Sequence, residues 1–181
     1  LQQDVAGFLK GHRATIYQHS KRISDYFEMS CFNYLVRYYE SRGFDTTISN
    51  LQKHKFRYKC STMGDPGNFS FFTVEKNGEV FEIHHNINIA SAHQEGTFTT
   101  PDISVILPDA IVEYKTFYQS GVKYHFCPNK CLVTFFESKN FNPFPELQFS
   151  FIGILNELKP SCLIKAIDIQ SEHIAPSWLM S

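Results

Sequence analysis

Residues 131–140 read CLVTFFESKN and are the most informative stretch of this 181-residue chain. The apolar run 132–136 is typical of a strand that is buried on both faces of a sheet. It is followed at once by Glu137 and Lys139. Because residues two apart in a strand face the same side, these two side chains are predicted to project together. A carboxylate and an ammonium at the end of a core strand are costly to bury unless partners meet them.

The segments around this strand predict a mixed fold. Downstream, a break at 142–145 starts a helix that Pro160 ends, and upstream a helix runs from Ser24 to Gly43. Asn77-Gly78 is the preferred dipeptide of a tight hairpin turn. The further expected strands lie at 46–48, 53–59, 69–75, 79–86, 102–107 and 163–169, with a short strand or irregular segment at 110–118. This order predicts an α/β (α+β) domain with a central mixed β-sheet flanked by helices.

Composition sets the broad class. Apolar residues make up 43% and charged residues 19%, which is ordinary for a globular domain. We expect an N-terminal basic arm or short helix over residues 1–23 and one domain over 24–181. No run of 18 apolar residues and no secretory signal is visible, and the five cysteines are scattered, so we expect no membrane partner, reduced thiols and a cytoplasmic location. The chain begins with Leu1 rather than Met, as in a domain cut from a longer protein.

The net charge of −1 conceals an uneven distribution. Residues 1–60 hold ten Lys or Arg and five Asp or Glu, whereas residues 61–181 hold seven and thirteen. Within the basic part, residues 53–59 alternate, so a strand there would carry one basic face. That face is either a phosphate-binding surface or an edge strand that lysines protect from aggregation. The residues of this face are Lys53, Lys55, Arg57 and Lys59.

A second unusual stretch adds a carboxylate. Asp102 follows Pro101 and opens an apolar strand. If it meets Glu137 and Lys139, the set suits a hard divalent cation, Mg²⁺ or Mn²⁺, which takes one or two carboxylates and leaves other positions to water and phosphate. The metal ligands would be Asp102, Glu137 and the Ser138 carbonyl. Lys139 would orient the attacking water or balance negative charge, and the chemistry implied is phosphodiester hydrolysis.

These residues resemble a known family. Pro101-Asp102, then Glu137-Ser138-Lys139, then a helix with Gln148, is similar to the PD-(D/E)XK nuclease superfamily, over roughly residues 24–169. The resemblance implies a restriction-endonuclease-like core and a Mg-dependent endonuclease that cleaves DNA, with RNA left open. Such a nuclease would be the catalytic domain of a restriction, defence or repair system, as a homodimer or within a larger assembly.

The resemblance also implies roles for single residues. Asp102 and Glu137 would be metal ligands and Lys139 the catalytic lysine. Glu28, on the first helix, and Gln148 would be auxiliary.

Other interpretations of the same residues stay open. Glu113-Tyr114-Lys115 is a second Glu-x-Lys and lies closer to Asp102, although 132–136 is the more strand-like run. Asp102 alone would be a Pro-Asp turn, and Glu137 with Lys139 alone a cross-strand ion pair. The alternative function is a catalytically inactive nucleic-acid-binding or assembly module of the same fold.

Overall fold

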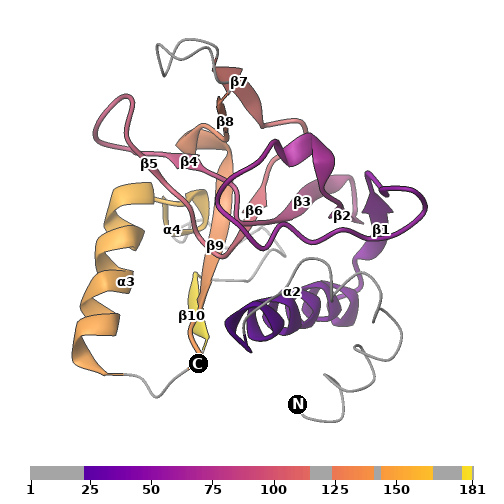
Figure 1. Cartoon of the computed structure of the whole chain (residues 1–181), viewed down its shortest axis with the longest axis horizontal. Helices are drawn as coiled ribbons and strands as arrows, with labels where there is room; N and C mark the ends of the chain where they lie inside the picture. The colour runs from indigo at the N-terminus through magenta and orange to yellow at the C-terminus, as the bar shows by residue number, and fades with distance from the viewer. Residues whose placement is uncertain (1–22, 115–123, 141–143, 165–176, 181) are drawn as a thin grey trace.

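The computed structural model describes residues 23–114, 124–140, 144–164 and 177–180. Its centre is a six-stranded sheet in the order β1-β2-β3-β6-β9-β10, with helices α2 and α3 on either side (Figure 1). The first five strands pair antiparallel, and β10 runs parallel to β9. The predicted mixed α/β fold with a central mixed sheet is therefore confirmed.

Five strands of the main sheet, all but β10, begin and end close to predicted positions. Asn77 (φ 53°) and Gly78 (φ 83°) both adopt the left-handed conformation that the tight turn between β2 and β3 requires, so this hairpin is confirmed. The strand expected at 110–118 is described only as far as residue 114. The bounds of the central strands are β1 (Asp45–Ser49), β2 (Phe71–Lys76), β3 (Glu79–His85), β6 (Ile103–Ile106), β9 (Leu132–Ser138) and β10 (Trp178–Met180).

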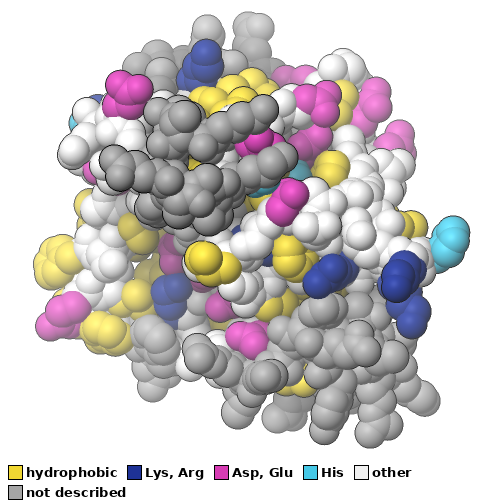
Figure 2. All heavy atoms as spheres, turned by 45° about the horizontal axis from the view of Figure 1, so that its top comes forward, with side chains coloured by type: hydrophobic (Ala, Val, Ile, Leu, Met, Phe, Trp, Pro, Cys, Tyr) yellow, Lys and Arg dark blue, Asp and Glu magenta, His cyan; other side chains and the backbone are white. Residues whose placement is uncertain are grey.

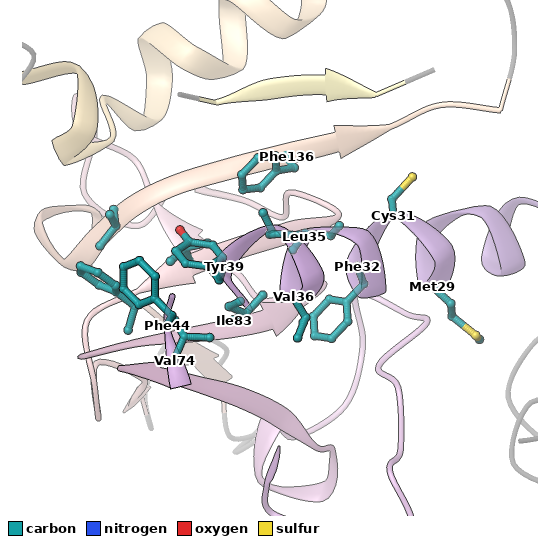
Figure 3. Packing of buried hydrophobic residues seen from close by; sticks show 14 of the residues in the cluster. Met29, Cys31, Phe32, Leu35, Val36, Tyr39, Phe44, Val74, Ile83 and Phe136 are labelled. Atoms are coloured by element: carbon teal, nitrogen blue, oxygen red, sulfur yellow. The ribbon is translucent and has the colours of Figure 1, made fainter. Parts of the chain in front are cut away.

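Helix α2 (Ile23–Ser41) covers one face of the sheet. Phe32, Leu35 and Tyr39 recur at helical spacing and are almost fully buried, and Figure 3 shows this side of the helix against the strands. The helix is followed by Gly43 (φ 81°), as predicted. This packing fixes the face of α2 that meets the sheet, and with it the position of Glu28.

Helix α3 (Pro145–Leu158) covers the opposite face. Consecutive strand residues point to opposite sides, so Phe136 joins the core under α2 while Phe135 packs on Phe151 of α3, with ring centroids 5.6 Å apart. The helix ends at Leu158 and is followed by Lys159, which has a left-handed backbone with a φ of 43°. The buried strand β9 is thus held from both sides, as its continuous apolar run predicted.

The C-terminal strand differs from the prediction. Residues 161–164, which include the start of the strand expected at 163–169, form the short helix α4 (Ser161–Ile164). Residues 165–169 and the arm 1–22 lie outside the described part. The strand beside β9 is instead β10, which the sequence pattern did not reveal because its three residues are too few for a periodic signal.

Smaller elements complete the description. Two short hairpins stand apart from the main sheet, β4 with β5 and β7 with β8. Their bounds are β4 (Ile89–Ala90), β5 (Phe98–Thr99), β7 (Val112–Tyr114) and β8 (Tyr124–Phe126), and the 3-10 turns are η1 (Pro66–Asn68) and η2 (Asn129–Cys131).

Candidate active site

Asp102 lies directly before β6, at the edge of the sheet where β9 ends. Its backbone carbonyl accepts a hydrogen bond from the Asn86 N–H at 2.9 Å, which ties it to the end of β3. Its Oδ2 atom accepts three hydrogen bonds, from the Ser138 N–H (2.7 Å), the Ser138 hydroxyl (3.1 Å) and the Lys139 ammonium (3.0 Å). The carboxylate therefore does more than cap its own turn, because it connects β6 to the end of β9.

Glu137 and Lys139 lie at the end of β9. The Lys139 Nζ atom is 2.8 Å from the Glu137 Oε2 atom, which confirms that the two side chains project to the same side. The Glu137 side chain is only 8% exposed, whereas that of Lys139 is 29% exposed. The lysine thus reaches solvent while it neutralises a buried carboxylate.

The three side chains converge as the sequence predicted. Because both carboxylates contact the same ammonium, at 3.0 and 2.8 Å, the Asp102 Oδ2 and Glu137 Oε2 atoms are less than about 6 Å apart, so the two carboxyl groups share one corner of the sheet. The strand register explains this convergence. Ile103 of β6 pairs with Phe136 of the antiparallel β9, so Asp102, just before Ile103, lies beside Glu137, just after Phe136.

Burial and charge perturb the pKa values of this cluster. Burial raises the pKa of Glu137, the negative charge of Asp102 raises it further, and Lys139 only partly offsets both. Burial by itself lowers the pKa of Lys139, but its hydrogen bond and ion pair with Glu137, joined by Asp102, outweigh this and raise it. Lys139 therefore remains a cation at neutral pH.

Glu28, on α2, lies beside the cluster. Its Oε2 atom is 3.7 Å from the Nε2 atom of His85, and its side chain is 19% exposed. Burial and the charge of Asp102 raise the pKa of Glu28 to about 7, although a hydrogen bond with the Asn86 side chain lowers it. The first helix thus brings a third carboxyl group close to Asp102. The auxiliary role predicted for Glu28 stays a prediction.

Gln148 does not join the described hydrogen bonds of the cluster. It lies in the first half of α3 and is exposed. Ser138 is 4% exposed and contributes two donors to Asp102. The roles predicted for Gln148 and for the Ser138 carbonyl stay predictions.

The basic strand predicted at 53–59 is wrong. Residues 52–55 form a tight turn in which Lys53 has a φ of 51° and Gln52 bridges Lys55, and residues 56–60 belong to no helix or strand. Lys59 is 2% exposed and donates to the Ser61 and Asn86 carbonyls, both at 2.6 Å, so it cannot reach a phosphate. The alternation of basic residues with Phe56 and Tyr58 resembled a strand pattern, because both aromatic side chains are buried although the segment pairs with no strand.

The remaining residues of that face do not form one surface. Lys53 and Lys55 are exposed, while Arg57 is half-buried over the ring of Phe69 at 4.9 Å. In the face drawn in Figure 2, the coloured Lys and Arg side chains stand in small groups among Asp and Glu side chains. Nucleic-acid binding by Lys53 and Lys55 stays a prediction, and Lys59 is removed from the set.

The alternative Glu-x-Lys pair occupies a different part of the fold. Glu113 belongs to β7, outside the main sheet, and its Oε2 atom is 3.8 Å from the Nε2 atom of His125. Lys115 lies outside the described residues. Asp102 instead contacts Ser138 and Lys139, so the structure brings it together with the Glu-x-Lys motif of β9.

The donor set bears on whether a cation fits. Within the described ranges, no group of three or more His, Cys, Asp or Glu side chains is arranged around a single metal position. The described hydrogen bonds of the Asp102 carboxylate all go to Oδ2. Asp102 Oδ1 and Glu137 could hold Mg²⁺ as a pair of carboxylates, with water and substrate phosphate as the other ligands, which is the arrangement this ion prefers.

Sequence reasoning missed two buried residues beside the cluster, His85 and Asn86, and it gave the buried Lys59 a surface role. The His85 ring is 3% exposed, and burial lowers its pKa to about 4. Both of its nitrogens lack a hydrogen-bond partner among the described residues. The only sequence signal was that polar residues, His84 to Asn86, end a strand that is otherwise apolar on one face.

Comparison with known proteins gives no family. No family model, no curated protein and no solved structure matches this chain. Within the described residues, no helix has both the length and the apolar character that crossing a membrane would need.

Proposed function

We propose that this chain is a metal-dependent nuclease that hydrolyses phosphodiester bonds in DNA. The observation that supports it best is the Lys139 ammonium, which contacts Asp102 at 3.0 Å and Glu137 at 2.8 Å where two neighbouring strands end. The sequence motifs Pro-Asp and Glu-x-Lys predicted this convergence across 35 residues of chain. Two carboxylates and a lysine at one corner of a sheet are the groups that metal-assisted hydrolysis needs.

Asp102 and Glu137 would hold the cation, Mg²⁺ or Mn²⁺, with the Ser138 carbonyl as a third oxygen. When bound, such a cation lowers the pKa of a coordinated water and stabilises negative charge on the phosphate. The hydrogen bonds from Ser138 to Asp102 Oδ2 would keep that carboxylate in place and leave Oδ1 available as a ligand.

The chain's own residues supply the remaining chemistry. Lys139, whose pKa is raised by its acidic neighbours, stays positively charged and can orient the scissile phosphate or balance the charge that develops on it. Glu28, whose pKa is about 7, can accept a proton at neutral pH. Lys53, Lys55 and the basic residues of the N-terminal arm would contact the DNA backbone through charge, without reading sequence.

One observation favours a second function. The Lys139 ammonium already contacts both carboxylates, so the cluster can also serve as a structural ion-pair network without metal. On that basis the chain would be a catalytically inactive module that binds nucleic acid or other subunits. The two functions differ in whether a divalent cation changes what the protein does.

Cleavage of supercoiled plasmid tests the proposal. The wild type is expected to nick DNA with Mg²⁺ or Mn²⁺ and to lose this activity in EDTA. Glu137→Gln and Lys139→Met are each expected to lower the rate by at least about a hundredfold, since each removes a charge that acts on the reacting phosphate. Glu75→Gln, on an exposed position of β2, is the matched control and should leave the rate unchanged.

The outcomes separate the two functions. Cleavage that survives both substitutions would show that the cluster is not the active site. DNA binding that is indifferent to EDTA, with no cleavage by the wild type under any divalent cation, would favour the inactive module.

A further inference from the structure

Asn86 connects the two sides of the candidate active site. It follows β3 directly and has a φ of 51°, in the left-handed region that asparagine tolerates better than most residues. Its N–H donates to the Asp102 carbonyl at 2.9 Å. Its side-chain amide donates to the Lys59 carbonyl at 3.0 Å. One residue thus ties the backbone of Asp102 to the buried segment around Lys59.

Lys59 in turn holds Asn86. Its Nζ atom donates to the Asn86 carbonyl at 2.6 Å and to the Ser61 carbonyl at 2.6 Å. The side chain is buried, and burial lowers its pKa to about 8. Burying a lysine is costly, and these carbonyls are the partners described for its ammonium. The two residues are joined in both directions, because the Asn86 amide also donates to the Lys59 backbone.

We propose that Asn86, clamped by Lys59, is a positioning residue that holds Asp102 in place for catalysis. The inference rests on the proposed nuclease function and deepens it. Neither Asn86 nor Lys59 touches the reacting atoms in this arrangement. Asn86 acts through Asp102, whose backbone carbonyl accepts a hydrogen bond from the Asn86 N–H.

The chemistry of asparagine fits this role. The left-handed backbone lets the N–H point to β6 while the carbonyl points to Lys59, and glycine could adopt it equally well. The amide, however, donates to the Lys59 carbonyl, and glycine has no side-chain donor. Replacing Asn86 by Gly should therefore remove the amide contacts while the backbone conformation is retained.

The chain offers a matched control for this substitution. Asn50 also has a left-handed backbone, with a φ of 55°. Its amide also donates two hydrogen bonds, to the Gly67 carbonyl at 2.8 Å and to the Phe69 carbonyl at 2.7 Å. None of the contacts described for Asn50 involves the cluster. Asn50→Gly therefore imposes the same chemical change away from the site.

Two measurements test the proposal. The first is the Mn²⁺ concentration that gives half-maximal plasmid cleavage. The second is the exchange rate of the Ser138 amide hydrogen, followed by NMR, because that N–H donates to Asp102 and reports whether its carboxylate is in place. Asn86→Gly should raise the Mn²⁺ concentration by about tenfold or more and speed Ser138 exchange, as loss of a residue that supports metal ligands does. Lys59→Met should act in the same direction and serves if Asn86→Gly does not fold.

The results distinguish this proposal from the one on which it rests. If Asn86→Gly and Asn50→Gly shift both readouts equally, Asn86 is merely structural and the positioning role is refuted, while wild-type cleavage still stands. If the wild type neither cleaves nor responds to Mn²⁺, the nuclease function fails and the catalytic role of Asn86 fails with it. Selective exposure of the Ser138 amide in Asn86→Gly would then show only that Asn86 orders Asp102.

Discussion

Replacing Lys139 by Met would leave two buried carboxylates facing each other without their shared cation. The ammonium is 3.0 Å from Asp102 and 2.8 Å from Glu137, so each contact represents roughly 6 kcal/mol of Coulomb attraction at an effective dielectric constant of about 20. Much of this only offsets the loss of hydration. Deleting one partner of a buried pair typically costs about 3–5 kcal/mol, because the remaining charge stays buried.

Solvent reduces that figure here. The Lys139 side chain is 29% exposed, so water can reach the position it leaves, and Asp102 keeps two hydrogen bonds from Ser138. We therefore expect Lys139→Met to lower the free energy of unfolding by about 2–3 kcal/mol at pH 7, which is a fall in melting temperature of about 5–10 °C. Glu137 bears most of the effect, because it is the more deeply buried of the two carboxyl groups.

The loss of unfolding free energy in Lys139→Met should depend on pH. The pKa of Glu137 is already raised by burial and by Asp102, and loss of the lysine raises it further. A carboxyl group whose pKa is raised in the folded state binds more protons there than in the unfolded state. The Lys139→Met variant, in which the pKa of Glu137 is raised further, therefore loses stability relative to the wild type as pH rises. The difference between wild type and Lys139→Met should therefore be small near pH 4 and grow toward pH 8.

Urea denaturation, followed by circular dichroism at several pH values, measures the free energy of unfolding of the wild type and of Lys139→Met. Adding Glu137→Gln to Lys139→Met should recover part of the lost stability, because it removes the unpaired charge. Lys130→Met, on an exposed side chain, is the control and should stay within about 0.5 kcal/mol of the wild type. If Lys139→Met is as stable as the wild type at pH 7, the ion-pair network does not hold this corner together and the electrostatic argument is refuted.

Two further predictions follow from single residues. Glu28 has a pKa of about 7 in the folded state against an ordinary 4.5, so its contribution to stability is complete below about pH 4.5 and is lost as pH rises through 7. Glu28→Gln should abolish this pH dependence and stabilise the protein by about 1–3 kcal/mol at pH 8. Thermal unfolding of Glu28→Gln that keeps the wild-type pH dependence would contradict the raised pKa. A Cβ atom at Gly78 or at Gly153 would meet no atom within 4 Å, so only the backbone decides the effect of alanine. Gly78→Ala, at a φ of 83°, should destabilise by about 1 kcal/mol, whereas Gly153→Ala, inside α3, should stabilise by about 0.5–1 kcal/mol; equal effects in chemical denaturation would refute this reading.

Local sequence patterns were sufficient for most of the secondary structure. The turn dipeptide Asn77-Gly78 specifies the hairpin because few other residues tolerate two consecutive left-handed conformations. The apolar run before Glu137 specifies a buried strand because both faces must leave water. The 53–59 segment misled the same reasoning, since alternation is necessary for a half-buried strand but is not sufficient without a neighbouring strand to pair with.

The candidate site was likewise predicted in part from the sequence and decided in part by the tertiary structure. Period-two alternation was enough to place Glu137 and Lys139 on one side of a strand, and residue chemistry was enough to suggest that a carboxylate such as Asp102 would join them. Only the tertiary structure decided that β6 lies beside β9 in the register that brings Asp102 to Lys139. It also decided that Asn86, directly after β3, and the buried Lys59 support Asp102. Local propensity acts over a few neighbouring residues, whereas strand order and the burial of a lysine depend on contacts between segments tens of residues apart, whose energies are settled together when the whole core packs.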